Sequence, residues 1–166
     1  MSRPIVYLSG PMTGQEYEEA ESWRGAAAAL LGIDGIAVSS PMRGKEALKG
    51  CGPLGGETAE IMNCGSRAIT QRDRYDVRNA DAMLVYFDAY TDRVSVGTMI
   101  ELGWADAFSV PVVVGYNPYT PEDLMTTIRA QIEHPIVEGI AGWVVPGLGQ
   151  ATEVLRQLLG PMCERG

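Results

Sequence analysis

Histidine is almost absent from this chain of 166 residues, which holds a single one, His134. One imidazole excludes a histidine-rich zinc site, because such a site needs several nitrogen ligands. A Ser-His-Asp triad would have to use that same residue, which stands beside Pro135 in a chain with no nucleophile-elbow motif. We therefore expect neither metal-dependent chemistry nor a serine hydrolase.

Cysteines, basic residues and long apolar runs are also scarce. The three cysteines, Cys51, Cys64 and Cys163, show no CxxC spacing, and an odd number is typical of reduced thiols. The 13 Lys and Arg residues stand against 21 Asp and Glu, and the net charge of −8 argues against binding to a nucleic-acid polymer. No apolar run approaches the roughly 20 residues of a membrane span, and no secretory leader follows Met1. We therefore expect a cytoplasmic protein that does not bind membranes.

What the sequence does contain is the composition of a globular α/β protein. Hydrophobic residues make up 46% of the chain and charged residues 20%, and we expect residues 1–166 to form one domain. Strand-like apolar runs alternate with helical segments, which predicts a three-layer sandwich with five mostly parallel strands. The glycine-rich segment 41–57 predicts a long loop that acts as a lid. The expected strands are 4–8, 36–38, 82–87, 110–114 and 140–145, and the expected helices are 16–31, 58–79, 97–108, 121–133 and 150–159.

Glu101 is the first candidate for a functional residue. It lies in the first turns of a predicted helix that follows the apolar strand 82–87, and Gly97-Thr98 leads into it. In an open α/β sheet, ligands bind where a loop leaves the carboxyl end of a strand and enters a helix. The free N–H groups and the positive dipole end of that helix suit an anion. From these residues alone, a glutamate that only helps to start the helix is the more ordinary interpretation.

The strand at 4–8 is predicted to deliver a second loop to the same edge of the sheet. That loop contains Tyr7 at the strand end and the turn Ser9-Gly10-Pro11-Met12. Its glycines lack the spacing of a dinucleotide fingerprint or a P-loop. Asp73 lies on the helix before the third strand, among charges of alternating sign that are typical of a solvated helix face. Taken singly, Tyr7 is interpreted as a core residue and Asp73 as a solvated one.

Taken together, these segments resemble the nucleoside 2-deoxyribosyltransferase superfamily, which also contains nucleoside 5′-monophosphate N-glycosidases. The resemblance spans residues 4–159 in element order, and its most specific part is Gly97-Thr98-x-x-Glu101-x-Gly103-x-Ala105. The turn after the first strand is also similar to that of phage-borne members of the group. The other matching segments are Tyr7-Leu8-Ser9-Gly10-Pro11, Arg72-Asp73, Ala80-Asp81 and Val110-Pro111-Val112.

The resemblance implies a flavodoxin-like fold, a homodimer or larger homo-oligomer, and a reaction that needs no metal and no organic cofactor. It implies that Glu101 attacks C1′ of the sugar and forms a glycosyl-enzyme intermediate. Asp73 would protonate the departing base, and Tyr7 would hold the Glu101 carboxylate. Two carboxyl groups with separate duties match the chemistry of retaining glycosidases. The substrate would be a nucleotide or nucleoside, and the substrate-binding candidates are Ser9, Gly10, Met12, Ser95, Gly97 and Asp92.

Ser95 is where the chain departs from the transferases of this group, which carry an aspartate six residues before the nucleophile to bind the sugar 5′-hydroxyl. A carboxylate about 4 Å from a phosphate oxygen costs on the order of 4 kcal/mol at an effective dielectric near 20. A serine hydroxyl and the N–H of Gly97 at a helix N-terminus accept a phosphate instead. We therefore expect hydrolysis of a nucleoside 5′-monophosphate, with Arg24, Arg43 or Arg93 as the cation that binds the phosphate.

Two alternatives stay open at this point. If the loop before the helix is bulged, Asp92 takes the place of the family's aspartate, and the protein is a deoxyribosyltransferase acting on free nucleosides. The other alternative is a nucleotide-binding module that uses the same pocket without turnover. The joint presence of Glu101, Asp73 and Tyr7 argues against it, because binding alone needs no nucleophile.

Overall fold

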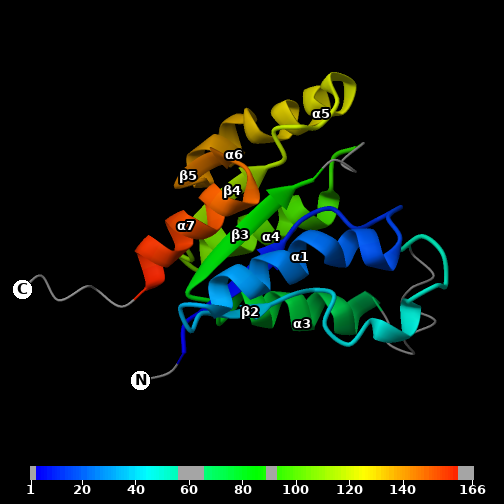
Figure 1. Cartoon of the computed structure of the whole chain (residues 1–166), viewed down its shortest axis with the longest axis horizontal. Coiled ribbons are helices and arrows are strands. Elements are labelled where there is room, and N and C mark those ends of the chain that lie inside the picture. The colour runs from blue at the N-terminus through cyan, green and yellow to red at the C-terminus, as the bar shows by residue number, and fades with distance from the viewer. Residues whose placement is uncertain (1–2, 56–65, 89–92, 161–166) are drawn as a thin grey trace, which may run out of the picture.

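The computed structural model describes residues 3–55, 66–88 and 93–160 (Figure 1). Within them, strands lie in the order β2-β1-β3-β4-β5, and every neighbouring pair is parallel. The predicted α/β sandwich is confirmed, with an all-parallel sheet. The strands are β1 (Ile5–Ser9), β2 (Ala37–Ser39), β3 (Ala82–Phe87), β4 (Val112–Tyr116) and β5 (Trp143–Pro146), and the helices are α1 (Tyr17–Gly32), a short 3₁₀ helix (Glu46–Leu48), α3 (Ser66–Arg78), α4 (Val96–Ala107), α5 (Glu122–Ile132), α6 (Pro135–Ile140) and α7 (Leu148–Leu159).

Helices cover both faces of this sheet (Figure 1). Successive strand side chains point to opposite faces, so Val6 and Leu84 pack with α1 and α7. Tyr7 and Val85 pack on the other face with α3, α4, α5 and α6. β3 is buried along its whole length, as expected for the central strand of a parallel sheet. In the part of the chain that is described, no helix is both long and apolar enough to cross a bilayer.

The structure corrects the prediction for the chain after β4. We predicted one helix over 121–133 and then a strand over 140–145, with no element between them. A separate helix, α6, stands between them, and β5 begins only at Trp143. His134 caps α6 by accepting the N–H of Ile136 at 3.3 Å. Pro135 occupies the first helical position, where its missing N–H has no partner to lose.

Other boundaries lie close to the prediction. The helix predicted over 58–79 is seen as α3 from Ser66 onward, and residues 56–65 lie outside the described part of the chain. Pro121, which we placed at the first position of a helix, is instead the N-cap of α5. Differences of this kind are expected, because helix ends are the least determined part of a helical pattern.

The segment that follows β2 packs on α1. Its residues Leu48 and Leu54 are buried in a cluster that includes the first half of α1. Two backbone hydrogen bonds, of 2.7 and 2.8 Å, join Leu54 to Gly14 and Gln15 in the loop after β1. The described part of the lid that we predicted over 41–57 is therefore attached to the β1–α1 loop.

The strand order places a switch point between β1 and β3. From β1 the chain crosses to β2 on one side, and from β3 it continues to β4 and β5 on the other. This is the flavodoxin-like order that the resemblance implies, and ligands in such sheets bind outside the carboxyl ends of the strands at the switch point. The loops that leave β1 and β3 meet at this place.

Candidate active site

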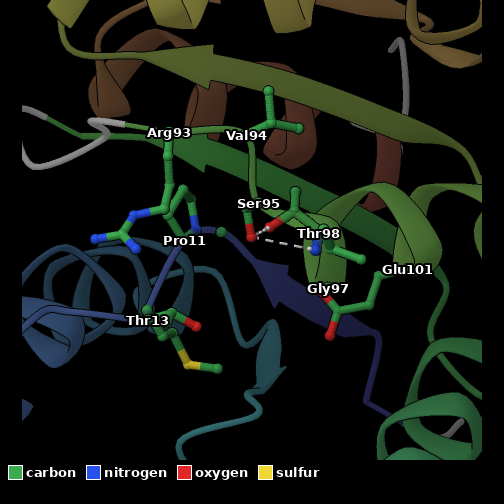
Figure 2. A pocket seen from close by; sticks show the side chains of 11 residues that line it. Pro11, Thr13, Arg93, Val94, Ser95, Gly97, Thr98 and Glu101 are labelled. Atoms are coloured by element: carbon green, nitrogen blue, oxygen red, sulfur yellow. Dashed lines mark hydrogen bonds between the residues drawn. The ribbon is translucent and has the colours of Figure 1, made fainter. Parts of the chain in front are cut away.

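A cavity of about 260 Å³ opens between the loops that leave β1 and β3 (Figure 2). One wall is the turn after β1, and the other is the segment that enters α4. Five of the catalytic and substrate-binding candidates line it, namely Gly10, Met12, Ser95, Gly97 and Glu101. The remaining lining residues are Pro11, Thr13, Arg93, Val94, Val96 and Thr98.

Two hydrogen bonds from side chains of β1 hold the carboxylate of Glu101. Glu101 lies in the second turn of α4 and is 8% exposed. The Tyr7 hydroxyl donates to Oε1 at 2.8 Å, and the Ser9 hydroxyl donates to Oε2 at 2.5 Å. Tyr7 and Ser9 are two residues apart on β1 and therefore share one face of the strand. Each oxygen of the carboxylate thus has its own donor, which fixes the orientation of the group.

Burial raises the pKa of Glu101 to about 7. The hydrogen bonds from Ser9 and Tyr7 lower it, the charge of Asp73 raises it, and the charge of Arg24 lowers it. The pKa of the Tyr7 phenol lies well above its ordinary value, mainly through burial and then through the charge of Glu101. Near neutral pH, Glu101 therefore exchanges between acid and carboxylate, and perturbed carboxyl groups in a cleft are typical of functional sites.

Asp73 is buried, so the interpretation of its helix face as solvated is wrong for this residue. Asp73 and Asp76 are three residues apart, lie on one face of α3, and are both buried. Arg72 donates to Oδ1 of Asp73 through Nε at 3.1 Å and Nη2 at 3.0 Å. Burial raises the pKa of Asp73, and the charges of Arg72 and Lys45 oppose that rise. Because its charge also acts on Glu101, the two carboxyl groups belong to one electrostatic site.

Lys45 belongs to the same site and was missed in the sequence. It lies on the segment that follows β2, is 5% exposed, and has a pKa lowered by burial. The charges of Asp73 and Glu101 act in the opposite direction and favour the ammonium form. A lysine in a glycine-rich loop has no periodicity that marks it as buried. Only the packing of the loop on α1 places it here.

The other end of the cavity is the N-terminus of α4. Ser95 is the N-cap, and its Oγ accepts the N–H of Thr98 at 3.4 Å and the hydroxyl of Thr98 at 2.9 Å. Its own N–H donates to Gln131 at 3.2 Å. Gly97 lies in the first turn, where helical N–H groups lack intrahelical partners. This end of the cavity therefore combines backbone donors with the positive end of the helix dipole.

Two of the arginines that we considered for a phosphate lie away from the cavity wall. Arg24 is 1% exposed and donates to the backbone oxygen of Gly10 at 2.9 Å. Arg43 is paired with Asp76 at 2.9 Å. Both guanidinium groups are thus engaged with the protein itself.

Arg93 has a different position. It lines the cavity, and in Figure 2 it lies across the cavity from Glu101, with Ser95 between them. Asp92, which we predicted as an alternative residue for the sugar 5′ group, lies outside the described residues. Within the described ranges, no group of three His, Cys, Asp or Glu side chains is arranged to hold a metal ion.

The fold and the placement of this cavity define an α/β protein with a candidate ligand site at the switch point of the sheet. Sequence comparison makes this assignment specific. Residues 6–149 match the family model of nucleoside 2-deoxyribosyltransferase, and the chain belongs to that family. No match was found among curated proteins.

Solved structures share this fold at low sequence identity. A conserved protein from Enterococcus faecalis V583 superposes with a TM-score of 0.63 at 18% identity, covering 95% of this chain and 100% of its own. A 2-deoxyribosyltransferase from Bacillus psychrosaccharolyticus gives 0.56 at 16% identity, covering 89% of this chain and 90% of its own. A CMP N-glycosidase from Clostridium botulinum gives 0.53 at 16% identity, covering 93% of this chain and 99% of its own. At these identities the likeness shows the fold alone.

Proposed function

We propose that this protein hydrolyses the N-glycosidic bond of a nucleoside 5′-monophosphate to a free base and a sugar 5-phosphate. The observation that carries the proposal is the difference between the two ends of the cavity. At one end Tyr7 and Ser9 hold the Glu101 carboxylate. At the other end stand a helix N-terminus, Ser95 and Arg93. The sugar carbon C1′ would lie at the first end and the 5′-phosphate at the second.

In the proposed reaction, ionised Glu101 attacks C1′ while the bond from C1′ to the base nitrogen breaks. Asp73, whose pKa is raised by burial, donates a proton to the departing base. This step leaves a glycosyl ester on Glu101. A water molecule then attacks C1′ and gives its proton to Asp73, which frees the sugar phosphate and restores both carboxyl groups. The sequence of steps is that of a retaining glycosidase.

The phosphate end of the cavity supports a charged 5′ group. Backbone N–H groups in the first turn of α4, Gly97 among them, and the helix dipole favour an anion. A guanidinium such as that of Arg93 binds phosphate through two parallel N–H donors. An aspartate in place of Ser95 would instead repel the phosphate by on the order of 4 kcal/mol at 4 Å and an effective dielectric near 20.

The family description favours a second candidate function, a 2-deoxyribosyltransferase that exchanges bases between free nucleosides. Glu101 would form the same ester, and a second base rather than water would attack it. Asp92 would then bind the 5′-hydroxyl. A module that binds nucleotides without turnover is a weaker alternative, because Tyr7, Ser9 and Asp73 all act on Glu101 in a way that binding alone does not need.

Chromatographic detection of free base tests the proposal. The panel contains ribo- and deoxyribonucleoside 5′-monophosphates and the matching nucleosides, each with and without a second base. We expect base release from monophosphates in the absence of an acceptor. Exchange confined to free nucleosides and added bases would replace the hydrolase with the transferase. No conversion anywhere in the panel would favour the binding module.

Ser95→Asp is expected to raise KM for the monophosphate by roughly 10²-fold, because an added carboxylate repels the phosphate even with partial screening. Asp and Asn both cap helices well, so Ser95→Asn is the matched control that keeps the cap without the charge. We expect the Asn variant to stay within about tenfold of the wild type. Steady-state kinetics on the best monophosphate measure both effects. Equal losses in the two variants would show that residue 95 does not face the phosphate.

A homo-oligomer remains part of this proposal. α4 exposes Val96, which lines the candidate active-site cavity, and Ile100, and α6 exposes Ile136. A second, apolar cavity of about 360 Å³ lies between α4, α5 and α6. Exposed apolar side chains gathered in this way are typical of interaction surfaces. The cytoplasmic location and the single domain over residues 1–166 also remain predictions.

A further inference from the structure

Arg24 is buried to a degree that is rare for arginine, with 1% of the residue exposed. It lies on α1, and its guanidinium carbon is 4.4 Å from the centroid of the Trp23 ring. Nη2 donates to the backbone oxygen of Gly10 at 2.9 Å, and Nη1 donates to that of Ala20. Nε is buried with no hydrogen-bond partner among the described residues. A charge in this position is costly unless nearby groups compensate it.

Anionic groups next to Arg24 supply that compensation. Burial lowers the pKa of Arg24 to about 10, and the carboxylates of Glu101, Asp88 and Glu21 oppose this fall, Glu101 most strongly. The guanidinium is therefore charged at neutral pH. The interaction is mutual, since the charge of Arg24 lowers the pKa of Glu101.

The bond to Gly10 connects Arg24 to the same carboxylate by a second route. A Cβ added at Gly10 would lie 2.6 Å from the backbone oxygen of Tyr86 and 2.9 Å from Cζ2 of Trp23, so this peptide is pressed against its surroundings and admits no side chain. Arg24 holds the carbonyl of the same residue. Gly10 directly follows Ser9, whose hydroxyl donates to Glu101. Arg24 and the Glu101 carboxylate are therefore both bound to the two-residue segment Ser9-Gly10 at the end of β1.

We propose that Arg24 is a positioning residue for Glu101. It holds the Gly10 peptide so that Ser9 points at the carboxylate, and its buried charge favours the ionised form of that carboxylate. Arg24 touches no substrate in this proposal. The kinetic part of this proposal rests on the proposed function, because the proposal takes Glu101 as the nucleophile. Its electrostatic part concerns the free protein and needs no substrate.

Other groups also act on Glu101 and enter the design of the test. Tyr7 on β1 donates a hydrogen bond to it, and Asp73 on α3 repels its charge. Lys45, on the segment after β2, attracts it. Variants at Arg24 leave all three in place, so a change in the ionisation of Glu101 reports on Arg24.

The test compares Arg24→Met and Arg24→Lys with the wild type. The pKa of Glu101 is read from the ¹³C shift of its side-chain carboxyl in glutamate-labelled protein, with Glu101→Gln to assign the signal. We expect Arg24→Met to raise this pKa by about one to two units, as loss of one nearby charge requires. Arg24→Lys keeps the charge, so its pKa should stay within about half a unit of the wild type. Arg129→Met, an exposed arginine on α5, should leave the signal unchanged.

The kinetic arm separates charge from position. In Arg24→Met, the acid limb of the pH profile of kcat/KM should move upward by the same amount as the pKa of Glu101. In both variants kcat on the plateau should fall by about tenfold or more, because lysine lacks the planar fork that reaches Gly10 and a small misplacement of a reacting group is costly. An unshifted Glu101 signal in folded Arg24→Met would overturn the electrostatic part. A kcat of Arg24→Lys equal to that of the wild type would overturn the positioning part. If Arg24→Met does not fold, Arg24→Lys alone decides that part.

The two proposals fail in different ways. If the Glu101 signal moves but no nucleotide is cleaved by the wild type, the electrostatic role of Arg24 stands and the proposed function falls. If nucleotides are cleaved and the signal does not move, the proposed function stands and the electrostatic role of Arg24 falls.

Discussion

Replacing Glu101 with glutamine is expected to lower the rate of base release by about 10³-fold or more, because a neutral amide cannot form the ester with C1′ on which the proposed reaction depends. Glutamine has nearly the same shape, and the hydroxyls of Tyr7 and Ser9 can donate to it or accept from it. The loss should therefore appear in kcat rather than in folding. It is measured as kcat and kcat/KM on the monophosphate that the wild type cleaves best.

Mass spectrometry of the acid-quenched enzyme gives a second measurement of the same prediction. The wild type mixed with substrate should carry a sugar-phosphate adduct, and Glu101→Gln should carry none. The matched control is Glu133→Gln at the end of α5, where the glutamate is exposed. It should react at the normal rate. A Glu101→Gln variant with near-normal turnover would exclude the covalent role of this residue.

The second large effect concerns stability. Between pH 4 and pH 8, the free energy of unfolding of Glu101→Gln is expected to gain about 3 kcal/mol relative to the wild type. Burial raises the pKa of Glu101 from 4.5 to about 7 in the folded protein. The unfolded chain therefore loses this proton at a lower pH than the folded protein does, and the wild type loses stability as the pH rises from about 4.5 to about 7. Glutamine does not titrate and escapes this loss.

Urea unfolding at a series of pH values measures this effect. The quantity of interest is the difference between the two proteins at each pH, because the titration of all other groups largely cancels in it. Placing an amide next to Tyr7 and Ser9 changes the free energy of unfolding by an amount that does not depend on pH, so it does not affect the pH dependence of this difference. Glu133→Gln should follow the wild type at every pH. A difference between Glu101→Gln and the wild type that stays flat from pH 4 to pH 8 would contradict a buried carboxyl with a raised pKa.

Much of the fold could be predicted because strands and helices are encoded by patterns of apolar residues over short stretches of the chain. The apolar run over 82–87 is β3, buried on both faces, and the helices on either side of it follow from periodic apolar residues. The second helix after β4 was missed because the six residues 135–140 are too short a run to show a helical period, and among them only Val137 is buried. His134 and Pro135 are the local signals that could have revealed it, as N-cap and first helical residue.

Some residues of the candidate site could likewise be identified from local sequence, and others only from the packing of the folded chain. The block from Gly97 to Glu101 could be identified because its residues are close in sequence and belong to one loop and helix. Asp73 was interpreted as solvated because alternating charge is common on exposed helices, and only the packing of α3 shows that its face is buried. Arg24 was considered for a phosphate, yet its side chain turns to the backbone of Gly10. No pattern in the sequence indicates which way that side chain points.

The sequence by itself thus determined the α/β class, the five strands and their parallel sheet, because hydrophobic periodicity and turn residues act over a few positions. Glu101 became a candidate through the resemblance of a short block, Gly97 to Ala105, whose residues are close in sequence. The tertiary structure alone decided that Ser9 joins Tyr7 on the Glu101 carboxylate, that Lys45 is buried within reach of the charges of Asp73 and Glu101, and that Arg93 rather than Arg24 lines the cavity. The Tyr7 and Glu101 partners are 94 residues apart. Contacts over such separations depend on how the loops pack at the edge of the sheet, and so do the dielectric surroundings that set the pKa of each carboxyl group.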